Sequence, residues 1–202
     1  MMLLYSAPAS PFGRKVKMTA RLKGLMDRIT VETIDTSRPD NPALRSRNPL
    51  QKIPVLILGD GTEFYDSRVI CEYLDSLAPA PPLFPASGGE RFDVLRRGAL
   101  ADGIMEAALL LVYEKRFRTE EQRSELWTAR QQSKIDAALD GLELAPPDRR
   151  GEPDYAHLAL AAALGYLDFR HDGRWRANRP KLLAWLERLD ADVPAFGETR
   201  PV

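Results

Sequence analysis

The sequence predicts an α/β domain with a mixed four-stranded sheet, followed by an all-α domain. Up to residue 78, short apolar or β-branched runs alternate with helical patterns in the order β-α-β-(α)-β-β-α. Residues 79–89 hold four prolines, which is typical of a semi-rigid linker. Beyond residue 90 the apolar spacing is helical throughout. We therefore expect one domain over 1–78, a linker over 79–89 and a helical bundle over 90–202.

The first half of the α/β domain has the pattern of a β-α-β unit. An apolar run over 2–5 predicts a buried strand, and the alternating run 29–34 predicts a second one. Between them, Ser10 suits the N-cap of a helix, Pro11 its first residue and Gly24 its C-terminal stop. A strand–helix–strand connection of this length predicts that the two strands are parallel.

The second half of this domain ends in a hairpin and a helix. Residues 43–47 predict at most a short helix. The apolar run 55–58, a Gly-Asp-Gly turn and the run 62–65 predict an antiparallel hairpin, which makes the sheet mixed. Asp66 and Ser67 then precede a helical pattern and suit its N-terminus.

The all-α domain is expected to contain four clear helices. An alanine cluster at 159 and 161–163 would permit close packing of one of them. We expect these helices over 90–117, 120–144, 154–169 and 180–189.

Composition narrows the class of protein. The 202 residues are 44% hydrophobic and 29% charged, as in ordinary globular proteins. Lys plus Arg and Asp plus Glu both number 29, and this balance argues against a nucleic-acid-binding protein. One Cys excludes an intramolecular disulfide, and two His leave little for a metal site. The N-terminal apolar run is only a few residues long, so we expect no signal peptide or membrane span and a cytoplasmic location.

Five motifs in this order together resemble the glutathione S-transferase family of bacteria. They are Ser10-Pro11-Phe12-x-Arg14, Gln51-Lys52-Ile53-Pro54-Val55, Asp66-Ser67, the proline-rich linker, and the segment 164–170. The resemblance spans essentially the whole chain. It implies a thioredoxin-like first domain, a helical second domain, glutathione as cosubstrate with no metal, and a cytoplasmic homodimer acting in detoxification. The implied partners are glutathione and a small electrophile, with no nucleic acid and no membrane.

Ser10 is the expected catalytic residue, because it matches the position where relatives hold the Ser or Cys that contacts the glutathione sulfur. A hydroxyl at a helix N-terminus can donate to an anion, and a thiolate is one. The alternative is that Ser10 only caps its helix. Ser6 and Tyr5 are weaker candidates for the same role. Because a serine cannot form a mixed disulfide, conjugation, isomerisation or thiolate stabilisation fits better than thiol–disulfide exchange.

The resemblance assigns the binding of glutathione to two segments. Pro54 matches the family's cis-proline, which would present the backbone of Ile53 to the cysteinyl part of glutathione; the alternative is a trans proline that starts an edge strand. Gln51 and Lys52 would lie near the glycyl carboxylate, and the alternative for Lys52 is a solvated loop charge.

Asp66 and Ser67 match the acidic-Ser pair that holds the γ-glutamyl group. Asp66 would pair with its ammonium, and the Ser67 hydroxyl with its carboxylate. The alternative is an ordinary N-cap, and both roles are compatible. The second substrate would lie between Ser10 and the helix beyond Glu90, where Met105, Leu109 and Tyr113 share a face; core or dimer interface is the alternative for these three.

Three other residues receive structural interpretations. Arg14 could shape the electric field near the thiolate or pair structurally with a carboxylate, and the structural role is favoured. Cys71 is expected to be a buried small side chain. Asp154 can cap its helix, but His157 stands where relatives carry the reciprocal carboxylate, so we expect an altered cap.

The function predicted is a glutathione transferase that offers a thiolate to a hydrophobic electrophile. Two alternatives stay open: another glutathione-dependent enzyme (isomerase, peroxidase or lyase), and a binding or regulatory protein that keeps the fold without turnover.

Overall fold

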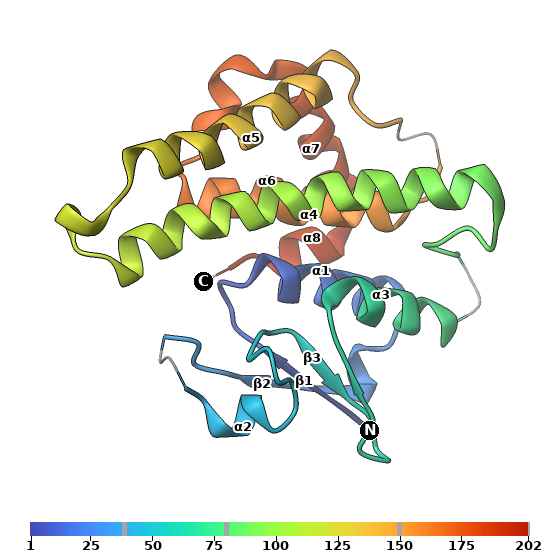
Figure 1. Cartoon of the computed structure of the whole chain (residues 1–202). Helices are drawn as coiled ribbons and strands as arrows, with labels where there is room; N and C mark the ends of the chain where they lie inside the picture. Colours follow the sequence, from blue (N-terminus) through green and yellow to red (C-terminus); the bar gives the residue numbers. More distant parts are fainter. Residues whose placement is uncertain (38–39, 79–80, 149–150, 202) are drawn as a thin grey trace. The chain divides into compact units, whose positions relative to one another are not determined.

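The computed structural model describes residues 1–78, 81–148 and 151–201 apart from 38 and 39. The chain forms two compact units: Met1–Arg91 together with Ala195–Val202, and Phe92–Pro194 (Figure 1). The last residues of the chain therefore group with the first unit, whereas the sequence pattern put them with the helical domain. The first two residues of the expected linker, 79 and 80, lie outside the described residues.

The first unit is built on a four-stranded mixed sheet, as predicted. Its strands are β1 (Met2–Ser6), β2 (Ile29–Thr33), β3 (Val55–Ile57) and β4 (Glu63–Phe64), in the spatial order β2-β1-β3-β4. β1 and β2 are parallel, while β1–β3 and β3–β4 are antiparallel. The β-α-β unit and the hairpin predicted from the sequence are both confirmed.

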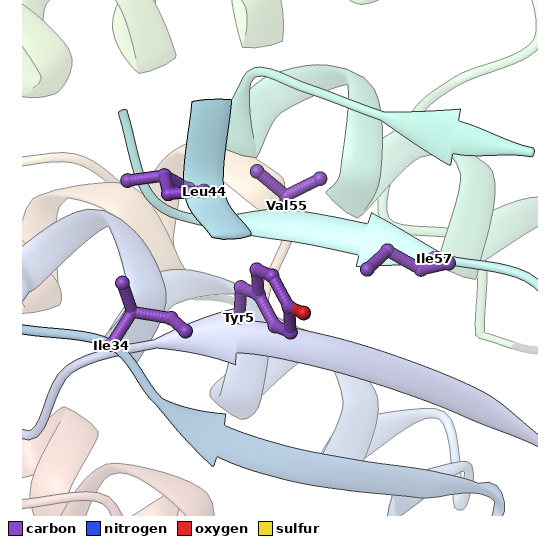
Figure 2. Close-up of a cluster of buried hydrophobic side chains, with 5 residues drawn as sticks. All are labelled: Tyr5, Ile34, Leu44, Val55 and Ile57. Atoms are coloured by element: carbon purple, nitrogen blue, oxygen red, sulfur yellow. The ribbon is translucent and has the colours of Figure 1, made fainter. Parts of the chain in front are cut away.

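Alternation along β1 gives the sheet two buried faces. Tyr5 belongs to a cluster on one face with Ile34, Leu44, Val55 and Ile57, which Figure 2 shows converging between the strands and α2 (Pro42–Arg45). Leu4 and Ser6 lie on the opposite face and are fully buried. Figure 1 shows α1 (Pro11–Leu22) and α3 (Ser67–Ser76) on that opposite face.

Helix α1 ends where the sequence indicated. Gly24 has a φ of +65°, a left-handed conformation that glycine adopts without steric cost. The Leu25 N–H donates to the Ala20 carbonyl at 2.8 Å, and the Gly24 N–H to the Arg21 carbonyl at 3.0 Å. These bonds satisfy carbonyls in the last turn of the helix and stop it.

A buried ion pair joins the end of α1 to the end of α3. Lys23 Nζ lies 2.8 Å from Asp75 Oδ1, and the two side chains are 0% and 10% exposed. Asp75 also accepts hydrogen bonds from the backbone N–H groups of Leu83 and Phe84. The same pair thus fixes the chain beyond α3, where Lys23 Nζ donates to the Pro81 carbonyl at 2.7 Å.

The chain returns to the first unit through α8 (Pro194–Glu198), a short helix that the sequence pattern did not predict. The Arg14 guanidinium, on α1, donates to the Phe196 carbonyl at 2.8 Å and lies 4.1 Å from the centre of the Phe196 ring. Arg14 is 4% exposed. Its role is therefore structural, as expected.

The second unit is helical. All thirteen residues from Tyr155 to Leu167 in α6 are buried, which the alanine cluster allows by keeping side chains small. Residues 120–144 were expected to form one helix, but Glu120–Gln122 is a separate 3₁₀ turn and α5 starts after Ser124, which caps it. The long helices are α4 (Gly88–Phe117), α5 (Glu125–Leu144), α6 (Tyr155–Arg170) and α7 (Pro180–Asp192).

The cap of α6 is altered, as expected, and it is nevertheless complete. Asp154 Oδ1 accepts from the His157 N–H at 3.0 Å, and His157 Nδ1 accepts in return from the Asp154 N–H at 3.1 Å. An imidazole nitrogen thus replaces the carboxylate oxygen as the reciprocal acceptor. The other ring nitrogen, Nε2, lies 2.9 Å from the Asp148 carbonyl, which supports the tautomer that the cap requires.

Candidate functional site

The strand register brings the three predicted site segments of the first unit to one end of the sheet. Tyr5 pairs with Val55 in antiparallel β1–β3, so the loop after β1, which leads to Ser10, lies beside the start of β3 and Pro54. Leu56 pairs with Phe64 in antiparallel β3–β4, so β4 ends at the same side and delivers Asp66 and Ser67 there. The loop before Ser10, the start of β3 and the start of α3 therefore lie together at one end of the sheet.

Ser10 caps α1 and is half-buried. Its Oγ accepts a hydrogen bond from the Gly13 N–H at 3.1 Å, while its carbonyl accepts from the Arg14 N–H at 2.9 Å. Pro11 has no N–H, so Phe12 supplies the remaining donor of the first turn. The cap uses a lone pair of the Ser10 oxygen and leaves its O–H available as a donor. The capping role and a thiolate-contacting role are therefore compatible.

The two weaker alternatives to Ser10 are less accessible. The Ser6 side chain is fully buried, and a Cβ built on Gly13 would lie 2.1 Å from its Oγ. Tyr5 is 8% exposed and packs in the cluster on the α2 face of the sheet (Figure 2).

The loop before β3 is held by Asn48, a residue that the sequence analysis did not single out. Asn48 is 2% exposed; its Nδ2 donates to the Lys52 carbonyl at 2.9 Å, and its Oδ1 accepts from the Leu50 N–H at 3.0 Å. The Asn48-Pro49 dipeptide, a turn signal, could have identified it. The Ile53–Pro54 peptide bond in this loop is cis, as the resemblance implied.

Gln51 and Lys52 occupy the same loop. Gln51 has a φ of +52°, and its Oε1 accepts from the Asn41 N–H at 3.2 Å, which ties the loop to the cap of α2. Its side-chain NH₂ group remains as a donor. Lys52 is exposed, and Ile53 is half-buried.

Asp66 is the N-cap of α3. Its Oδ1 accepts from the Arg68 N–H at 3.0 Å, and its side chain is exposed. Ser67 follows as the first helical residue and is 3% exposed. A carboxylate and a hydroxyl thus stand at a helix N-terminus, where the dipole favours a bound anion.

Both parts of the chain match one family. Residues 4–82 match the glutathione S-transferase N-terminal domain, and residues 125–188 match the glutathione S-transferase C-terminal domain. An uncharacterised glutathione-S-transferase-like protein of Escherichia coli, YibF, is 37% identical over 206 residues, which cover 99% of this chain and 98% of that protein. The chain belongs to the glutathione S-transferase family.

Solved structures of bacterial family members agree with this assignment. A glutathione transferase family member from Pseudomonas fluorescens Pf-5, solved with bound glutathione, is 40% identical with a TM-score of 0.91, and the match covers 100% of both chains. A glutathione S-transferase from Methylobacillus flagellatus, also solved with glutathione, is 34% identical with a TM-score of 0.88, again over 100% of both chains. The mixed sheet and helical second part of this family member are therefore those of the glutathione S-transferase fold.

Four further residues discussed in the sequence analysis lie outside the segments that are predicted to bind glutathione. Cys71 is fully buried and accepts a hydrogen bond from Thr19 Oγ1 at 3.3 Å, in agreement with its expected packing role. In the second unit, Met105 is fully buried, while Leu109 and Tyr113 are half-buried.

The described residues lack two features of other protein classes, a membrane-spanning helix and a cluster of metal ligands. None of their helices is long and apolar enough to cross a membrane. In the same described ranges, no three His, Cys, Asp or Glu side chains gather in a way that could hold a metal ion.

Proposed function

We propose that this protein is a glutathione transferase. Glutathione binds to the first unit, Ser10 stabilises its thiolate, and the thiolate attacks a small, hydrophobic electrophile. Family membership and the glutathione bound to the relatives from Pseudomonas and Methylobacillus support the cosubstrate. The observation that supports the chemistry most directly is the Ser10 cap, in which the oxygen accepts from Gly13 and the hydroxyl hydrogen remains to be donated.

The chemical task is modest in energy. A free thiol has a pKa of about 8.5, so only a few per cent is ionised at neutral pH. A hydrogen bond to a charged acceptor contributes about 1.5–3 kcal/mol, which lowers a thiol pKa by roughly one to two units. One hydroxyl donor at the positive end of α1 is therefore sufficient, and its bond from Gly13 makes it a better donor.

Glutathione, a tripeptide, is proposed to lie along the end of the sheet where these three segments meet. Asp66 pairs with the γ-glutamyl ammonium, and Ser67 with the α-carboxylate at the start of α3. The backbone of Ile53, before Pro54, pairs with the cysteinyl part as an added strand would. Gln51 and Lys52 hold the glycyl carboxylate with an amide donor and an ammonium.

The reaction is a nucleophilic substitution or addition. The thiol proton passes to water, and the sulfur of the thiolate forms a bond to the electrophilic carbon. In a substitution, the leaving group departs with the electron pair of the bond that breaks; in an addition, the π bond breaks, its electron pair moves to the neighbouring atom, and that atom takes a proton from water. Ser10 stays unmodified. Catalysis rests on ionisation of the thiol and on placement of the two substrates.

Binding of glutathione is the first test. The protein should bind immobilised glutathione and show a higher Tm when glutathione is added, because a ligand that binds only the native state stabilises it. A protein that neither binds nor shifts would remove the basis of the proposal.

The role of Ser10 is tested by Ser10→Ala in the glutathione-bound protein. We expect the thiol pKa, followed by the ultraviolet absorbance of the thiolate, to rise by about one to two units, and the rate with a chlorodinitrobenzene to fall, with little change in glutathione affinity. Ser10→Thr keeps the hydroxyl and should retain most of the rate.

A matched control separates this role from helix capping. Ser124 caps α5 in the same way, because its Oγ accepts a hydrogen bond from the backbone N–H of Trp127 at 3.2 Å. Ser124→Ala should lower stability by a similar amount, about 1 kcal/mol, without moving the thiol pKa. If Ser10→Ala behaves like Ser124→Ala, the thiolate is stabilised by another group.

The family resemblance also supports a homodimer located in the cytoplasm. Helix α4 carries large apolar side chains that are exposed in the single chain, Phe92 at 71% and Leu100 at 39% among them. A partner subunit would cover such side chains. Analytical ultracentrifugation should therefore give twice the mass of one chain.

A further inference from the structure

A cavity of about 230 Å³ lies within the first unit, on the side of the loop between β1 and α1 that faces β2. It is lined by the end of β1 and the loop that follows, the edge strand β2, one face of α1, Met26 and the chain from the end of α8 to Arg200. None of Ser10, Gln51, Lys52, Ile53, Pro54, Asp66 and Ser67 lines it. The sheet order β2-β1-β3-β4 puts this cavity on the β2 side of β1, whereas the glutathione segments follow β1, precede β3 and follow β4.

The cavity wall carries more positive than negative charge. Lys17, Arg21 and Arg200 line it, together with a single acidic residue, Glu198. Glu198 is already paired, because its Oε2 lies 2.6 Å from Arg21 Nη1. Its negative charge is therefore paired with Arg21 and not with Lys17.

Lys17 is the cation best placed to bind a ligand. It is half-buried, and it forms no hydrogen bond or ion pair with any other residue that the structure describes. Burial, reinforced by the nearby charges of Arg14 and Arg21, lowers the pKa of Lys17. A half-buried ammonium beside two guanidinium groups is stabilised by an anion that enters the cavity.

The rest of the wall suits a small apolar body. Met26 and Val31 line the cavity, and Val31 is 40% exposed although it is an apolar residue on the edge strand. Ser6 also lines it, and the Ser6 Oγ has no hydrogen-bond partner among the described residues. The volume is below the roughly 300–1,000 Å³ of pockets for drug-sized ligands, so the fitting molecule is small.

We propose that this cavity is a second ligand site, which binds a small organic monoanion through its carboxylate. The carboxylate pairs with the Lys17 ammonium, and the apolar body packs on Met26 and Val31. The single positive charge of Lys17, which has no partner among the described residues, matches the single negative charge of such a ligand. The site is independent of the glutathione segments, so it stands or falls separately from the proposed transferase activity.

The test uses benzoate as the probe and isothermal titration calorimetry on the full chain. Benzoate should bind, and benzamide, its neutral isostere, should bind at least tenfold more weakly. Lys17→Met, which keeps the length of the side chain without its charge, should weaken benzoate at least tenfold. Lys181→Met, a matched change at an exposed lysine of the second unit, should not. Equal affinities for benzoate and benzamide, or for the wild type and Lys17→Met, would overturn the proposal.

A second variant and a second measurement guard against misfolding. Val31 is already exposed, so Val31→Asp should keep the fold, and its carboxylate should repel benzoate and weaken binding at least tenfold. In ¹H–¹⁵N NMR spectra of the wild type, benzoate should shift the amide signals of Lys17, Val31 and Thr33. Shifts confined to Ser10 and Ser67 would place benzoate at the glutathione segments and contradict the proposal.

Discussion

At the start of α1, Gly13 lies so close to the Ser6 side chain that a methyl group on Gly13 would collide with it. A Cβ built on Gly13 would lie 2.1 Å from Ser6 Oγ and 3.3 Å from Ser6 Cβ. Both residues are buried, so neither can turn into solvent. Glycine is therefore required here by space rather than by backbone conformation.

Gly13→Ala should lower the free energy of unfolding by about 1–3 kcal/mol, because the new methyl group overpacks a closed contact. The measurement is urea unfolding followed by circular dichroism. In the double variant with Ser6→Gly the obstructing atoms are gone, and the loss due to Gly13→Ala should become smaller. Equal losses in both backgrounds would show that Ser6 is not the obstacle.

At the scale of one element, the N-terminus of α6 is held by a charged cap. Arg97 Nη2 lies 2.6 Å from Asp154 Oδ2, and the His157 N–H donates to Oδ1 of the same carboxylate. Burial acts to raise the pKa of Asp154, but its interactions with the His157 and Arg97 side chains outweigh burial and hold the pKa well below its ordinary value. The charged cap therefore favours the folded state.

Asp154→Asn should cost about 2 kcal/mol at neutral pH, because asparagine keeps a capping oxygen but loses the charge that Arg97 pairs with. A carboxyl whose pKa is lowered on folding stabilises above its unfolded pKa, about 3.9, and this contribution is lost as the pH falls towards the folded pKa. Urea unfolding at a series of pH values should show the difference between wild type and variant shrinking below about pH 4.

Asp93 provides the control for this experiment, since it also pairs with Arg97 but its side chain is 49% exposed. Asp93→Asn should cost less than about 1 kcal/mol, as exposed pairs do. A cost for Asp154→Asn that is just as small, or that does not change with pH, would contradict the role given to the charged cap.

At the scale of the whole molecule, the first unit is completed by the far end of the chain. Residues 195–202 return to it after the complete second unit. There Phe196 is 5% exposed, receives the Arg14 guanidinium on its carbonyl and stacks beneath it. The α/β unit thus includes a segment that lies more than a hundred residues later in the sequence.

Phe196→Ala should lower the free energy of unfolding by about 3–5 kcal/mol, because it removes a buried ring and exposes the Arg14 contact. Leu126→Ala, at a side chain that is 83% exposed on α5, should cost less than about 1 kcal/mol. Guanidinium unfolding of the two variants gives the comparison, and equal costs would mean that the chain end is dispensable for the first unit.

Much of the fold follows from local patterns in the sequence. Alternation in β1 and β2, the Gly-Asp-Gly turn before β4 and the helical spacing beyond residue 90 each depend on neighbours in the chain, so they can be recognised without the tertiary structure. The sequence analysis missed two short features. The break before α5 depends on a capping box at Thr119 and Gln122, and α8 is too short to show a period.

The residues of the candidate site were also only partly recognised from the sequence. The family resemblance singled out Ser10, Pro54, Asp66 and Ser67, and the glutathione roles of these residues stay predictions that the proposed experiments test. Asn48 was missed because its side chain acts through hydrogen bonds to the Lys52 carbonyl and the Leu50 N–H, which a pattern of apolar residues does not record.

The sequence by itself determined the order of the elements, the chemistry available at each segment and the family resemblance, because these depend on residues close in the chain. Only the tertiary structure decided which groups meet. Antiparallel pairing of β1 with β3 brings Ser10 and Pro54 to one end of the sheet, Arg97 of α4 pairs with Asp154 at the start of α6, and Lys17 lies half-buried in a cavity on the β2 side. Such encounters depend on packing between distant segments, and that packing sets burial, charge balance and hydrogen-bond geometry together.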